Sequence, residues 1–129
     1  MARQFSRAER RYAPGLYGPF VIDGRLAGDT GAVVTLTRVA WPGDSNTPVV
    51  TLLAEYLYGT VWSSAASAVF NGGVQIDRFT GAVVAASFLS VGWPEHLVDG
   101  QLVPNKPDAI RLSATVHLAL DTAVSLTWR

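Results

Sequence analysis

The stretch that decides the fold is residues 111–129, which read RLSATVHLALDTAVSLTWR. From residue 111 to residue 120 apolar side chains alternate with mostly polar ones, and the alternation resumes after Asp121-Thr122. Because successive side chains of a strand point to opposite faces, each run predicts a strand with one buried face. Two such strands separated by a short polar link predict an antiparallel hairpin, and its apolar face needs further strands to cover it.

Further strands are predicted along the rest of the chain, where runs rich in β-branched and aromatic residues are separated by Gly, Pro and Asp. The runs are residues 16–22, 32–41, 49–58, 68–77 and 82–93. Asn71-Gly72-Gly73 is a hairpin signal inside one of them, and residues 94–108 are predicted to form an irregular loop. Seven or eight short strands predict an all-β fold, an antiparallel β-sandwich or jelly roll, in one domain over residues 16–129.

Residues 1–15 are predicted to form a short basic arm outside this domain. The spacing of its apolar residues fits a short amphipathic helix, and the alternative is an extended arm that becomes ordered on a partner. We expect the arm to bind an acidic surface of a neighbouring protein, and deletion of residues 1–12 to leave the fold intact. The residues expected to bind the partner are Arg3, Phe5, Arg7, Arg10, Arg11 and Tyr12.

The composition indicates that part of the apolar surface is buried against other subunits. Hydrophobic residues make up 49% of the chain and charged residues 16%, and the charged share is below the usual quarter. Residues 49–58 and 82–93 are apolar on both faces, so we predict that both faces are covered. The candidate subunit interface is Val49, Leu53, Tyr56, Leu57 and Tyr58.

Net charge, the absence of cysteine and the length of the apolar runs argue against several classes of function. Ten basic and ten acidic residues give zero formal net charge, which argues against a general nucleic-acid binder. The chain has no cysteine, hence no disulfide or thiolate metal site. No apolar run is long enough to predict a membrane span, and the charged N-terminus has no apolar stretch behind it, so no secretory signal is expected.

Residues suited to catalysis or metal binding are sparse. His96 and His117 do not fall in a metal-binding spacing, so we predict no metal site and no cofactor. Glu55 is the one acid inside a predicted core strand, and we expect it to form an ion pair with an arginine on a neighbouring strand, such as Arg38 or Arg78. No serine lies in the glycine-flanked turn of a hydrolase nucleophile. We therefore do not expect an enzyme.

The tryptophans raise an alternative, a carbohydrate-binding or adhesion module that stacks sugars on aromatic rings. Trp62 lies among small residues and is the candidate exposed aromatic. Trp41 and Trp93 precede prolines at strand ends, where a ring can stand at the rim, whereas Trp128 is expected in the core. The alternative for all four tryptophans is packing in the core or at an interface. Rings buried in a subunit contact would favour an assembly protein, and rings in a row on an exposed face would favour the glycan binder.

Four features together resemble small structural proteins of tailed-phage virions: residues 33–42, the Asn71-Gly72-Gly73 turn, Asp77-Arg78 and residues 112–128. The resemblance covers residues 30–129 as a pattern, and the proteins concerned are capsid decoration proteins and minor tail or baseplate components. It implies location in a virion, assembly with other virion proteins and a homo-oligomer, most often a trimer. A surface glycan is the further partner that the carbohydrate-binding alternative would add.

Overall fold

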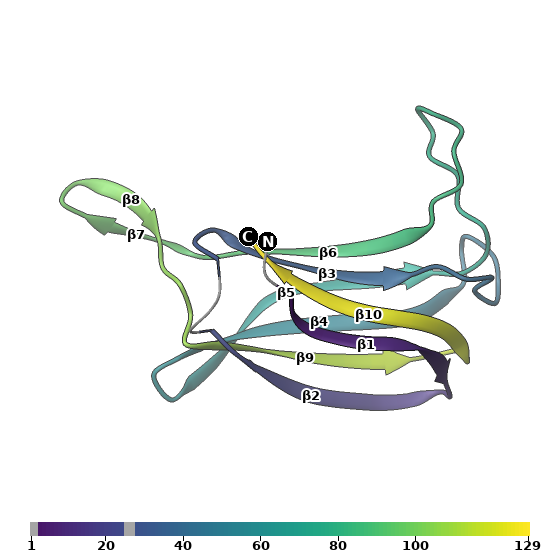
Figure 1. The fold of residues 1–129 in the computed structure, drawn as a ribbon, viewed down its shortest axis with the longest axis horizontal. Helices are drawn as coiled ribbons and strands as arrows, with labels where there is room; N and C mark the ends of the chain where they lie inside the picture. The colour runs from purple at the N-terminus through teal and green to yellow at the C-terminus, as the bar shows by residue number, and fades with distance from the viewer. Residues whose placement is uncertain (1–2, 25–27) are drawn as a thin grey trace.

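The computed structural model describes residues 3–24 and 28–129, with side chains from Phe5 onward, as ten antiparallel strands (Figure 1). The first sheet has the order β1 (Arg3–Tyr12), β10 (Leu120–Trp128), β3 (Gly31–Thr37) and β6 (Ala86–Gly92). The second sheet has the order β2 (Gly15–Asp23), β9 (Ala109–Val116), β4 (Pro48–Tyr58) and β5 (Val61–Asn71). Strands β7 (Glu95–Val98) and β8 (Gln101–Pro104) form a separate hairpin. The predicted all-β antiparallel architecture is confirmed.

The two sheets pack face to face, because each strand turns a row of apolar side chains toward the other sheet. Val34 of the first sheet and Ile110 of the second are fully buried, and so is Leu126 on β10. Burying one large aliphatic side chain stabilises the fold by about 1.5–3 kcal/mol. These inward rows form one continuous core between the sheets.

The predicted hairpin in residues 111–129 is wrong, because β9 lies in the second sheet and β10 in the first. Both strands exist, but the chain passes between the sheets at residues 117–119 instead of reversing within one sheet. A chain that crosses to the facing sheet keeps its apolar row turned inward on both sides of the crossing. Alternation alone therefore looks the same for a hairpin and for a crossing.

The N-terminal segment is a strand, so the predicted helix is wrong and the expected arm outside the domain does not hold. β1 is the edge strand of the first sheet and pairs with β10 from Arg3↔Thr127 to Tyr12↔Leu120. The Tyr12 side chain is 8% exposed, and Phe5 packs against the core. The sandwich therefore begins at β1, and the boundary predicted at residue 15 falls at the link between β1 and β2.

Asn71-Gly72-Gly73 does not close a hairpin, contrary to the prediction. β5 ends at Asn71, and the glycines lie against the loop that follows β3, where the Gly72 N–H donates to the Thr47 carbonyl oxygen over 2.9 Å. A side chain at Gly72 would overlap the Pro42 carbonyl oxygen, and Gly73 has a φ of 70°. Glycine is needed here for a close approach of two loops.

Two hairpins project from the sandwich at opposite ends of its long axis (Figure 1). One is β7–β8, within the segment predicted to be an irregular loop; its turn, Asp99-Gly100, has φ angles of 50° and 78°, as two-residue hairpin turns favour. The other spans residues 74–85, where Ile76 pairs with Val83. Neither hairpin contributes a strand to the two main sheets.

Candidate partner-binding surfaces

The predicted subunit-interface residues of β4 do not share one surface. Val49 is 0% exposed and Tyr56 is 7% exposed, so both belong to the core and their assignment to a subunit contact is wrong. Tyr58 is half-buried, and its hydroxyl donates to a backbone oxygen of the segment before β9. Leu53 and Leu57 lie half-buried on the outer face of the second sheet. Because β4 lies between β9 and β5, both of its edges are paired, while its outer face has no second layer over it in the described residues.

The second run predicted to be covered on both faces is β6, an edge strand of the first sheet. Leu89 and Val91 point into the core, whereas Phe88 on the outer face is 61% exposed. In the described residues, the outer face of β6 is therefore not covered by another part of the chain.

Three side chains from three adjacent strands meet on the outer face of the second sheet. Arg111 of β9 lies opposite Glu55 of β4 and donates to both carboxylate oxygens, Nε–Oε1 2.9 Å and Nη2–Oε2 3.0 Å. Its guanidinium carbon lies 4.3 Å from the centre of the Trp62 ring on β5. The predicted ion pair of Glu55 with an arginine on a neighbouring strand is confirmed, but the arginines given as examples, Arg38 and Arg78, are not its partner.

This bidentate pair stabilises the charged form of both groups. The hydrogen bonds from Arg111 lower the pKa of Glu55, and partial burial of the carboxylate opposes that effect. The same bonds raise the pKa of Arg111. Glu55 is therefore held as a paired carboxylate, an arrangement that suits a fixed surface contact better than proton transfer.

Arg38 has a different role from the one predicted. Its Nε donates to the Ser87 hydroxyl over 3.0 Å, and its guanidinium carbon lies 4.2 Å from the centre of the Trp41 ring. Burial lowers the pKa of Arg38. The side chain thus joins β6 to the loop after β3.

The tryptophans lie mostly in the core. Trp41 and Trp93 are 4% and 5% exposed, so of the two alternatives their rings pack in the core and do not stand at the rim. Trp128 is 2% exposed, which confirms its predicted place in the core. Trp62, the candidate exposed aromatic, is half-buried and has the Arg111 guanidinium over its ring.

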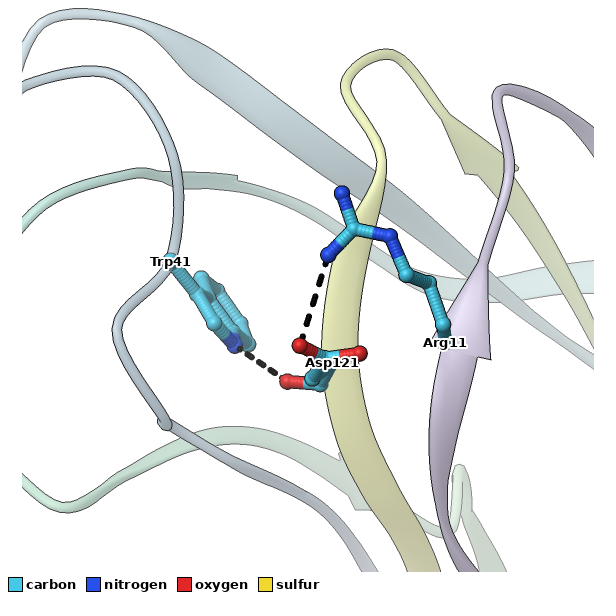
Figure 2. A network of polar contacts seen from close by, with 3 residues as sticks. All are labelled: Arg11, Trp41 and Asp121. Carbon is cyan, nitrogen blue, oxygen red and sulfur yellow. Dashed lines mark hydrogen bonds and ion pairs between the residues drawn. The ribbon is translucent and has the colours of Figure 1, made fainter.

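The predicted arm residues are distributed over β1. Figure 2 shows Arg11 reaching Asp121 on β10, with Nη1 3.4 Å from Oδ2, while the backbone oxygen of Asp121 accepts a hydrogen bond from the Trp41 indole at 3.2 Å. Both charged side chains of this pair are largely solvent-accessible, and such pairs add little stability. The side chain of Arg3 lies outside the described residues.

The hairpin of residues 74–85 presents an aromatic ring at a fixed tip. The Asp77 carboxylate accepts hydrogen bonds from the backbone N–H groups of Phe79 at 2.8 Å and Thr80 at 3.0 Å. These bonds lower the pKa of Asp77. The Phe79 side chain is 90% exposed, and Ile76 and Val83 beside it are also exposed. The sequence analysis did not identify this surface.

The β7–β8 hairpin is the second apolar projection. Leu97 and Leu102 pair across it and are 71% and 63% exposed.

His96 lies on β7, and His117 lies after β9 with its Nε2 2.8 Å from the Thr51 hydroxyl. Over the residues that the structure describes, no three acidic or histidine side chains gather as a metal site. None of the described residues forms a helix that could span a membrane.

Comparison with known protein families, with characterised proteins and with solved structures gives no match to this chain.

Proposed function

We propose that the chain is a structural protein of a tailed-phage virion, a capsid decoration or minor tail component that acts through protein–protein contacts. The strand order carries the proposal. With the β7–β8 hairpin set aside, the remaining eight strands follow the orders 1-8-3-6 and 2-7-4-5 in the two sheets. We infer from this order that the sandwich is a jelly roll, a class that includes viral capsid domains. The order thus supports both the jelly-roll class and a capsid-type role.

The two projecting hairpins supply the contact surfaces in this proposal. Their exposed apolar side chains, with Phe79 at one end and Leu97 at the other, are of the kind that marks protein contacts. Because the hairpins leave the sandwich at opposite ends, one copy can contact different neighbours with each (Figure 1). Contacts between unlike surfaces close into rings when the rotation permits. We propose a homo-oligomer, a trimer by the resemblance to virion proteins, that also contacts other virion proteins.

The carbohydrate-binding alternative has less support. Lectin domains share the jelly-roll class, but Trp41, Trp93 and Trp128 lie in the core. The Trp62 ring is already in contact with the Arg111 guanidinium. A sugar would have to displace that contact in order to stack on the ring.

Molar mass measured by light scattering tests the proposal. The wild-type chain is expected to be an oligomer at micromolar concentration, because a monomer would leave the apolar side chains of both hairpins exposed to water. Phe79→Ser and Leu97→Ser should each shift the mass toward the monomer. Phe88→Ser is the matched control, since Phe88 is 61% exposed but lies on the body of the sandwich. A wild-type chain that remains monomeric would refute self-assembly through the hairpins.

A further inference from the structure

A cavity of about 250 Å³ lies between the two sheets. It is lined by the inward side chains of β1 and β2 and by core side chains of both sheets, and its lining is mainly apolar. β1 and β2 are the edge strands of their sheets and lie along the same edge of the sandwich (Figure 1). An apolar cavity of about 150 Å³ can hold benzene, so this larger cavity has room for a short alkyl chain.

Two arginines line this cavity at positions where a sandwich normally places apolar residues. Arg7 and Arg10 lie opposite Val124 and Thr122 of β10, and both side chains are exposed. A register shift between them in the β1–β10 pairing brings both onto the inward face although they are three residues apart. The lining therefore joins an apolar interior to two positive charges.

Neither guanidinium is neutralised by the chain as far as it is described. Arg7 lies over the Phe20 ring, 4.7 Å from its centre, and Arg10 lies 4.5 Å from the centre of the Tyr12 ring. In residues 5–24 and 28–129 neither has a carboxylate partner, in contrast to Arg11. Stacked guanidinium groups keep their N–H donors available for an anion, and they bind carboxylates in a bidentate manner.

Tyr12 provides an independent indication of a ligand. Its side chain lines the cavity and is 8% exposed, and its hydroxyl is buried without a hydrogen-bond partner. A buried unsatisfied hydroxyl destabilises a fold by about 1–3 kcal/mol. Thr122, the other polar residue deep in the lining, donates its hydroxyl hydrogen to the Thr37 carbonyl oxygen at 2.8 Å. In the described residues the other buried side-chain group without a partner is the Trp128 indole N–H, and Trp128 does not line the cavity.

We propose that the cavity binds a monocarboxylate with an apolar tail, of the size of a medium-chain fatty acid. The tail lies between the sheets and the carboxylate lies between Arg7 and Arg10. Inward charges on an edge strand also discourage edge-to-edge pairing. That role explains the arginines, but it explains neither the cavity nor the unsatisfied hydroxyl.

Calorimetric titration of the full chain with octanoate tests the proposal, with octanol and octyl phosphate as comparison ligands. We expect saturable one-to-one binding of octanoate and weaker binding of octanol, which lacks the charge. The Arg7→Gln/Arg10→Gln variant should bind octanoate about tenfold more weakly or worse. Arg11→Gln is the matched control, because Arg11 already pairs with Asp121, and this variant should bind octanoate as tightly as the wild type.

Two further variants separate binding from folding. Tyr12→Phe should fold at least as stably as the wild type and still bind octanoate, because the buried hydroxyl that it lacks has no hydrogen bond to lose. Ala114→Leu, which fills the cavity from β9, should abolish binding. Equal binding of octanol and octanoate would overturn the role of the arginines. Binding of octyl phosphate alone would overturn the carboxylate assignment, and no saturable binding would overturn the site.

Discussion

Replacing Tyr12 with alanine tests whether β1 is part of the folded domain. Its ring packs edge-on against Tyr17, with centroids 5.2 Å apart, and its backbone lies opposite Leu120. Truncating a buried phenylalanine or tryptophan to alanine costs about 3–5 kcal/mol. The Tyr12 hydroxyl has no hydrogen bond to lose and the ring already borders a cavity. We therefore expect the low end of that range, about 3 kcal/mol.

The expected shift is readily measured by thermal unfolding followed with circular dichroism. An unfolding entropy of about 2.1 cal/mol/K per residue gives about 0.27 kcal/mol/K for 129 residues, so the midpoint should fall by about 11 °C. Leu16→Ala is the matched control, because Leu16 lies on β2, the next strand along the chain, and is 84% exposed. The unfolding midpoint of this variant should change by about 2 °C or less. An unchanged midpoint for Tyr12→Ala would refute the placement of β1 in the sandwich.

Three further perturbations test other parts of the fold. Deleting residues 1–12 should lower the urea midpoint further than Tyr12→Ala does, because it also uncovers the edge of β10; equal midpoints would mean that the rest of β1 contributes nothing. The ion pair of Glu55 holds its pKa below the ordinary value of 4.5. The wild type should therefore have a larger free energy of unfolding than Glu55→Gln above pH 4.5, and this difference should disappear as the pH falls through the lowered pKa. A constant advantage down to acid pH would contradict the pairing. Gly72→Ala should destabilise the chain because its new methyl group meets a backbone oxygen, whereas Gly92→Ala, with nothing within 4 Å, should be tolerated; similar unfolding midpoints would contradict the close approach.

The strands themselves were predictable from the sequence because their signal is local. Residues 49–58 carry β-branched and aromatic side chains between proline and glycine, and β4 spans Pro48–Tyr58. Which strands pair is a long-range property. Alternation reports which side of a strand is buried and does not report which sheet contains it, so β9 and β10 were assigned to one hairpin although they face each other across the core.

The same distinction separates the surface features that were predictable from those that were not. Glu55 was identified as an ion-pair candidate, but its partner Arg111 is fixed by the β4–β9 register, which no local pattern contains. The projecting hairpins did have local signals. Asp77 is followed by Thr80-Gly81, a sequence suited to a turn closed by the aspartate side chain, and Asp99-Gly100 is a strong two-residue turn signal.

The N-terminal segment was misassigned because of the same residues that line the cavity. With the register shift between residues 7 and 10, both positions fall on the inward face of β1, where apolar residues are expected, and both are arginines. An interior strand could not place charged heads there, because burying an unpaired charge is too costly. An edge strand can, since the arginine stems cover apolar surface while the guanidinium groups reach water. The same two arginines therefore break the alternation of β1 and give the open cavity its positive charge. Departures from regular sequence patterns are expected at sites where a chain binds a ligand or partner.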